Sequence, residues 1–116
     1  MEKFLEQTLL YDFYGELLTE HQRSVYENAV LNDYSCTEIA QERGISRQGV
    51  HDLIRRCQRA LEGYEDKLHL VERFLSVKEK VSEIGEILDE WEREKKNPEE
   101  IVERIRRISD TIIEEL

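Results

Sequence analysis

The sequence predicts an all-α fold in which a helix-turn-helix domain, residues 1–62, is followed by an acidic helical hairpin, residues 63–116. Helix-favouring residue types dominate, because the 116 residues include only one Pro and five Gly. Side chains that cap helix N-termini recur through the first half of the chain. Apolar residues recur at steps of three and four through the second half, which is typical of amphipathic helices.

The first helix is predicted within the segment EKFLEQTLLYDFYG, which ends at Gly15. Glycine commonly marks the end of a helical pattern. The apolar residues of this segment fall at helical spacing. They are Phe4, Leu5, Leu9, Leu10, Phe13 and Tyr14.

Three further helix starts are marked by capping side chains. Thr19 with Gln22, and Ser35 with Glu38, fit the capping box, in which two side chains bond backbone N–H groups that the first turn leaves unpaired. Ser46 caps a third helix without such a partner. The first domain is therefore predicted to contain four helices.

The segment between the second and third caps has the pattern of a helix-turn-helix. Ala40 is expected where two helices cross closely, because a larger side chain would force them apart. Gly44 is expected to adopt the positive φ that the tight turn needs. Arg43 occupies a place that is commonly apolar, so its stem is expected to lie over the edge of the core with its guanidinium in water.

The helix that begins after Ser46 divides into two faces. Its inward stripe is Val50, Leu53, Ile54, Cys57 and Leu61. Its outer face and flank carry four arginines, which would contact base edges or phosphates. The candidate nucleic-acid-binding residues are Ser46, Arg47, Gln48, His51, Arg55, Arg56 and Arg59. Asp52 on the same face is expected to pair with Arg55 or Arg56.

From Gly63 onward the apolar spacing indicates a long helix with a coiled-coil seam. The seam is Phe74, Val77, Val81, Ile84, Leu88 and Trp91. Asn97 as N-cap and Pro98 as the first helical residue predict the start of a second helix. Its apolar side is Ile101, Ile105, Ile108, Ile112 and Leu116. The two helices are expected to form an antiparallel hairpin, and residues 70–116 are expected to form a homodimer.

Charge and composition limit the functions that the chain can have. The formal net charge is -10, but residues 19–62 hold six basic and seven acidic side chains, so a site for a polyanion is expected there. No sequence pattern of a catalytic site is present, and we expect no enzyme activity, no cofactor and no metal. Cys36 and Cys57 do not form a C-x-x-C pair. In a cytoplasmic protein such isolated thiols are usually small buried apolar residues. No apolar run approaches membrane-spanning length, and we expect a cytoplasmic protein.

Two resemblances add to this interpretation. Residues 17–68 resemble region 4 of the sigma-70 class of bacterial sigma factors, which reads promoter DNA. The segments YDFYGELLTEHQR, EIAQERGISRQGVHD and YEDKLHLVERF resemble the YlxM family, small bacterial helix-turn-helix proteins associated with the signal recognition particle pathway. In this chain Gly49 stands where the family commonly has Ala, and His51 where it commonly has Tyr.

The YlxM resemblance implies a regulatory or accessory protein that contacts the RNA or the protein components of the signal recognition particle. The sigma-factor resemblance implies instead a transcriptional regulator that binds duplex DNA through residues 46–59. A protein adaptor that uses the same fold without nucleic acid is a third hypothesis. It predicts that Arg47 and Arg55 can both be replaced by Ala without loss of the partner.

Overall fold

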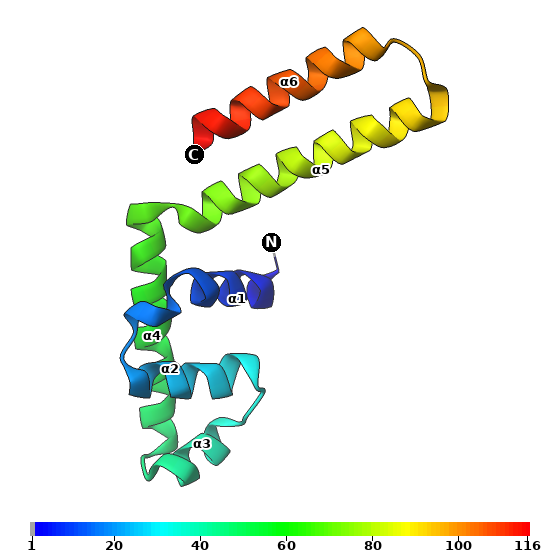
Figure 1. Cartoon of the computed structure of the whole chain (residues 1–116). Helices are drawn as coiled ribbons and strands as arrows, with labels where there is room; N and C mark the ends of the chain where they lie inside the picture. The colour runs from blue at the N-terminus through cyan, green and yellow to red at the C-terminus, as the bar shows by residue number, and fades with distance from the viewer. Residues whose placement is uncertain (1) are drawn as a thin grey trace. The chain divides into compact units, whose positions relative to one another are not determined.

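A computed structural model describes residues 2–116, and within this range it contains helices and no strand (Figure 1). The all-α prediction is confirmed. The chain divides into two compact units, residues 1–71 and residues 72–116. The helices are α1 (Lys3–Tyr14), α2 (Glu20–Tyr26), α3 (Cys36–Arg43), α4 (Arg47–Leu68), α5 (Leu70–Glu94) and α6 (Pro98–Glu115).

The end of α1 at Gly15 agrees with the prediction, and a 3-10 turn, Gly15–Leu17, follows it. Gly15 has an ordinary helical φ of -57°, so backbone freedom is not what requires it. A Cβ atom at this position would lie 2.8 Å from the ring of Tyr11, which is too close for real atoms. The aromatic ring therefore occupies the space that a side chain at Gly15 would need.

The predicted caps form to different extents. Thr19 Oγ1 accepts from the backbone N–H of Gln22 at 3.2 Å, and Gln22 Oε1 accepts from the N–H of Thr19 at 2.9 Å, which confirms the capping box of α2. Ser35 Oγ accepts from the N–H of Glu38 at 3.1 Å and so caps α3. Among residues 2–116 the Glu38 side chain does not return that bond, so this box is half formed.

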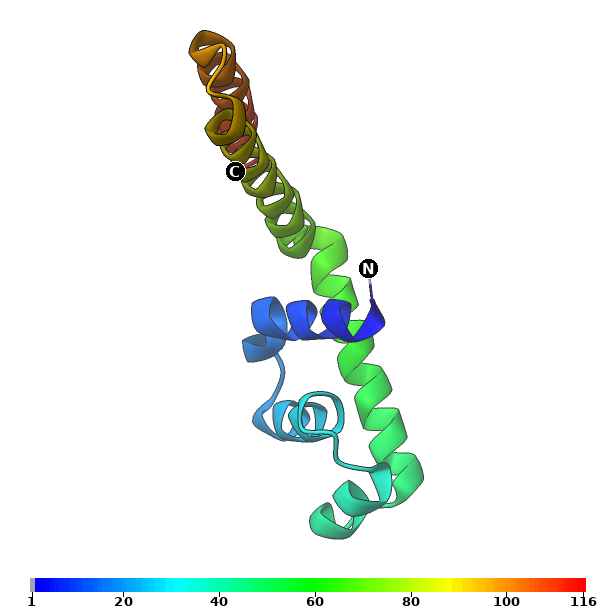
Figure 2. The ribbon, with the colours of Figure 1, turned by 90° about the vertical axis from the view of Figure 1, so that its right-hand side faces the viewer.

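Helix α4 is the longest helix of the first unit and the surface against which its neighbours pack. It continues through Gly63 for 22 residues and ends where His69 turns into the left-handed region with φ 56°. Helices α1, α2 and α3 all pack against it, as two views of the ribbon show (Figures 1 and 2). Its residues Val50, Cys57 and Leu61 are fully buried.

A polar network joins α1 to the end of α4 and the start of α5. The hydroxyl of Tyr14 donates to Glu65 Oε1 at 2.5 Å and accepts from the N–H of Leu70 at 3.1 Å. Glu65 Oε1 also accepts from the N–H of Val71 at 2.9 Å. Burial and the bond to Glu65 raise the pKa of Tyr14 above its ordinary value. These bonds satisfy N–H groups that the first turn of α5 leaves unpaired.

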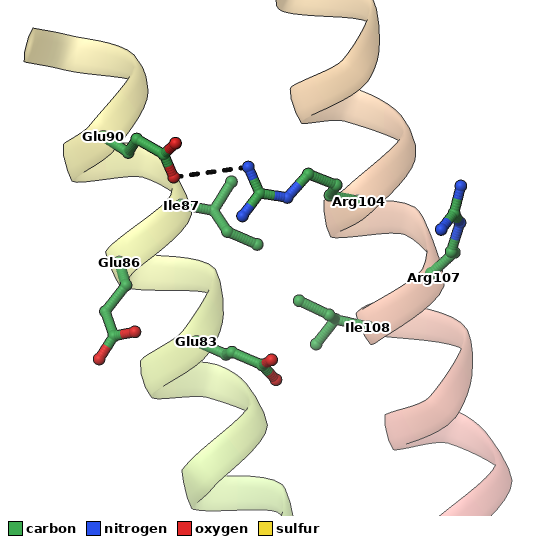
Figure 3. A pocket seen from close by; sticks show the side chains of 7 residues that line it. All are labelled: Glu83, Glu86, Ile87, Glu90, Arg104, Arg107 and Ile108. Atoms are coloured by element: carbon green, nitrogen blue, oxygen red, sulfur yellow. Dashed lines mark hydrogen bonds and ion pairs between the residues drawn. The ribbon is translucent and has the colours of Figure 1, made fainter. Parts of the chain in front are cut away.

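In the second unit, α5 and α6 form the predicted hairpin, but the apolar side that α5 turns toward α6 differs from the predicted seam. Ile87, which the prediction left out, is the most buried residue of α5 in this unit, at 5% exposed. Ile87 and Ile108 point toward one another (Figure 3). Trp91 and Ile84 are half-buried. Phe74, Val81 and Leu88 of the predicted seam are exposed.

Helix α6 follows its prediction more closely. Its four isoleucines at positions 101, 105, 108 and 112 are half-buried, whereas Leu116 is exposed. Two cross-hairpin ion pairs accompany them: Arg104 with Glu90, where Nη1 and Oε2 are 3.4 Å apart, and Lys80 with Glu115. The first of these pairs is drawn in Figure 3.

Asn97 stands at the predicted N-cap of α6, directly before Pro98, but its side chain forms no capping bond. Its backbone is left-handed, with φ 54°. Asparagine tolerates this conformation better than most residues. Asn97 therefore serves the turn through its backbone, and the prediction that its side chain caps α6 is wrong.

The Tyr14 network yields a stability prediction. Replacing Tyr14 with Phe removes the hydroxyl that bonds Glu65 and Leu70 while keeping the buried ring, so we expect the free energy of unfolding to fall by about 1 to 2 kcal/mol. The measurement is urea denaturation followed by circular dichroism at fixed protein concentration. Tyr34→Phe is the matched control, because Tyr34 is exposed and its hydroxyl has no described partner, and its effect should be within about 0.5 kcal/mol. Equal effects of the two changes would contradict the network.

Candidate nucleic-acid interface

The turn between α3 and α4 has the predicted backbone geometry. Gly44 ends α3 in the left-handed region with φ 68°, as the sequence predicts, and its N–H donates to the carbonyl of Ala40. The N–H of Ile45 donates to the same carbonyl at 3.1 Å. A side chain at Gly44 would meet nothing within 4 Å, so the positive φ is the reason for glycine here.

The close helix crossing predicted at Ala40 is part of a small buried cluster. Ala40 is 9% exposed, and it packs with Val25 of α2, Ile39 of α3 and Val50 of α4, each fully buried. Partly buried apolar residues surround this cluster. They are Ala29, Cys36, Leu53 and Ile54. The cluster fixes how α4 lies on α2 and α3, and thereby which side of α4 faces solvent.

Arg43 differs from its prediction. The residue is half-buried, and one of its terminal nitrogens, Nη2, donates to the hydroxyl of Ser24 on α2. Its Nε is buried and has no partner among the described residues. The guanidinium therefore takes part in the α2–α3 contact instead of lying in water. The sequence could not show this, because Ser24 is nineteen residues away in the chain.

All seven candidate nucleic-acid-binding residues are exposed; Ser46 caps α4, and the other six lie on the helix between Arg47 and Arg59. In the part of the chain that the structure describes, no carboxylate forms an ion pair with Arg47, Arg55, Arg56 or Arg59. At a rise of about 1.5 Å per residue, the strip from Arg47 to Arg59 is about 18 Å long. Four unpaired guanidinium groups along this length can each bind a phosphate oxygen.

Asp52 does not pair with an arginine, and that prediction is wrong. Its Oδ1 accepts from Gln48 Nε2 at 3.1 Å, one helical turn earlier. The acid is thus held by a neutral neighbour on its own helix, which is a weak and local bond. Because Arg55 and Arg56 are not occupied by Asp52, the basic side chains of the face remain available to a ligand.

Ser46 and Gly49 shape the N-terminal end of α4. Ser46 Oγ accepts from the N–H of Gly49 at 2.9 Å and caps the helix, as predicted. A Cβ atom at Gly49 would lie 3.1 Å from that oxygen, closer than side chains usually approach. Gly49 therefore leaves room for the Ser46 hydroxyl, which still has a proton to donate to a ligand.

The two cysteines are free thiols that differ in environment. Cys57 is fully buried on the inner face of α4, as predicted, and burial raises the pKa of its thiol. Cys36, at the start of α3, is half-buried, and its Sγ lies 3.9 Å from Nδ1 of His51. This contact links α3 to the outer face of α4. Sequence reasoning missed it, because the two residues are fifteen positions apart.

Comparison with known proteins identifies the family of this chain. Residues 1–109 match the model of UPF0122, described as "Putative helix-turn-helix protein, YlxM / p13 like". The chain belongs to the UPF0122 family. The family is described as helix-turn-helix, and the YlxM resemblance is confirmed.

The relatives within UPF0122 described next cover between 72% and 93% of the chain. A UPF0122 protein of Thermoanaerobacter sp. (strain X514) is 44% identical over 108 residues, which are 91% of this chain and 92% of the relative. One of Bacillus mycoides (strain KBAB4) is 39% identical over 108 residues, 93% of this chain and 98% of the relative. One of Acetivibrio thermocellus is 48% identical over 84 residues, 72% of each chain.

Two glycines in this UPF0122 protein offer a paired test of the turn. Gly44→Ala places a side chain at φ 68°, which is unfavourable for L residues, and should lower the free energy of unfolding by about 1 to 2 kcal/mol. Gly63→Ala lies inside α4, where the new methyl group would meet nothing within 4 Å, and should raise it by up to about 1 kcal/mol. Urea denaturation of each variant and of the wild type measures both changes in the free energy of unfolding. A stabilising Gly44→Ala change would contradict the turn geometry.

Proposed function

We propose that this protein is a non-enzymatic regulatory or accessory protein of the signal recognition particle pathway, and that the outer face of α4 contacts nucleic acid. The observation that supports the proposal is a strip of four exposed arginines on the second helix of a helix-turn-helix, none of which has an ion-pair partner among residues 2–116. The candidate contact residues are Ser46, Arg47, Gln48, His51, Arg55, Arg56 and Arg59. The pathway is proposed from the YlxM resemblance.

We also propose that the protein is located in the cytoplasm, where the particle acts. There it forms a homodimer through residues 70–116. Across residues 2–116, no helix is both long and apolar enough to cross a bilayer. The exposed apolar residues of α5 and α6 support a contact with a second copy.

The arrangement of charge favours RNA of defined shape over bulk duplex DNA. Duplex affinity depends on the number of phosphates that basic side chains neutralise, and the recognition face offers only four arginines. The net charge of -10 opposes long-range attraction of any polyanion. A folded RNA that presents a few phosphates and bases to one face needs fewer such contacts.

The second candidate is a transcriptional regulator that binds duplex DNA through α4. The observation in its favour is the helix-turn-helix itself, in which the second helix is exposed on its outer face and capped at its N-terminus by Ser46. A dimer would present two such helices, and their spacing on DNA would have to be about 34 to 36 Å.

The deciding measurement is fluorescence anisotropy of labelled signal recognition particle RNA titrated with the protein at two salt concentrations. Unlabelled duplex DNA serves as competitor. Binding of RNA with weak competition from DNA supports the role in the signal recognition particle pathway. Strong competition from DNA supports the transcriptional regulator. If neither nucleic acid binds, the face contacts a protein and the proposal fails.

The arginine strip yields a mutational prediction for the same assay. Replacing Arg47 and Arg55 together with Ala should weaken RNA binding at least tenfold and should lower the slope of log K against log salt concentration by about one to two. Arg106→Ala is the control, because Arg106 is exposed on α6 with no ion pair in the described residues. It removes one positive charge away from the face, and it should change affinity less than about twofold. Unchanged binding by the double variant would favour the protein adaptor.

A further inference from the structure

Helix α5 has two apolar sides, and α6 covers only one of them. The covered side includes Ile84, Ile87 and Trp91, and a groove lies along it between the helices (Figure 3). The other side is a row of exposed residues at alternating steps of four and three, which on a helix fall within an arc of about 80°. We call this row the outer seam: Phe74, Lys78, Val81, Gly85, Leu88 and Glu92.

The outer seam exposes large apolar side chains in a regular order. Phe74, Val81 and Leu88 are 41%, 55% and 47% exposed, and they are spaced by one heptad. Single exposed apolar residues are normal on a protein surface, but a row with heptad spacing is typical of a helix that packs against another helix. The α5 residues that line the groove beside α6 are Glu83, Glu86, Ile87 and Glu90, and none of them belongs to this row.

Gly85, at the middle of the outer seam, has open space beside it. A Cβ atom there would meet nothing within 4 Å, and the residue lies inside the 25-residue helix α5. Glycine at such a position costs up to about 1 kcal/mol relative to Ala. Its absent side chain lets a second helix approach the backbone of α5 closely.

The charges of the outer seam favour a second copy of this chain as the binding partner. Lys78 lies seven residues before Gly85 and Glu92 lies seven residues after it, and neither forms an ion pair among residues 2–116. If two copies of α5 cross antiparallel at Gly85, Lys78 of each copy lies opposite Glu92 of the other, and Val81 lies near Leu88. A parallel crossing would place Lys78 against Lys78. The row is thus complementary to itself in the antiparallel direction alone, as an interface with two-fold symmetry requires.

We propose that the outer seam is the surface through which a second copy of this chain binds, with two α5 helices crossing antiparallel at Gly85. This inference rests on the proposed homodimer and specifies its geometry.

Charge reversal with sedimentation equilibrium tests the register on the full chain. Lys78→Glu and Glu92→Lys should each raise the dimer dissociation constant about tenfold, because each creates two like-charge contacts in the dimer. The double variant restores both pairs with the signs exchanged, and its dissociation constant should return to within about threefold of the wild-type value. Glu92→Lys also lowers the net negative charge of each copy, which reduces the general repulsion between two copies. A weaker dimer in this variant would therefore come from the local contact.

Glu79→Lys is the matched control for Glu92→Lys, since it makes the same change of charge at an exposed position of α5 outside the outer seam. It should leave the dissociation constant unchanged or lower it. A wild-type chain that stays monomeric would overturn the homodimer itself. A wild-type dimer whose single variants bind normally, or whose double variant is no better than the single ones, would overturn only the register.

Gly85→Leu tests the close crossing separately from the charges. Leucine favours helix formation more than glycine, so the hairpin should keep its helix content by circular dichroism. The added side chain would hold the two α5 backbones apart, and the dissociation constant should rise at least tenfold. A dimer of normal affinity in this variant would exclude a crossing at Gly85.

Discussion

The packing of one face of α4 against three shorter helices is the constraint on which the candidate interface depends. Val50, Cys57 and Leu61 are fully buried, and burying a Val or Leu side chain contributes roughly 1.5 to 3 kcal/mol. Because α4 is a rigid helix, fixing this inner face also fixes its outer face toward solvent. The short turn at Gly44 then places α3 beside the start of α4. The arginines are exposed as a consequence of the core.

The charge of the chain is compatible with a nucleic-acid site because charge acts locally. Exposed charges further apart than a Debye length of about 8 to 10 Å are largely screened at physiological salt. Arg47 and Arg55 respond mainly to their near neighbours, and the acid on the same face, Asp52, is bonded to Gln48. The remaining acids lower long-range attraction more than they lower contact affinity. Such a protein would discriminate against non-specific polyanions and bind where several contacts coincide.

What the sequence predicted well depends on residues close together in the chain. The Thr19 capping box, the Ser46 cap and the positive φ of Gly44 are local, and each was confirmed. Two errors were local: Asp52 bonds Gln48 instead of an arginine, and the Asn97 side chain forms no cap. The other errors arose from contacts between distant residues. Arg43 bonds Ser24, and Ile87 replaces part of the predicted seam, because two apolar stripes on α5 overlap and periodicity alone cannot say which one α6 covers. The exposure of the candidate site was predictable from helical spacing, whereas the Cys36 contact with His51 was not.

The hairpin shows why folding and assembly should be coupled in this protein. Residues 72–116 bury only Ile87 almost completely, and α6 buries no residue fully, so the two helices share little core of their own. Two antiparallel helices cannot shield both sides of their apolar surface from water, and isolated helices gain most of their stability from packing. A second copy on the outer seam would supply the missing contact. The stability of the hairpin would then depend on protein concentration, since any partner that binds only the folded state stabilises it by mass action.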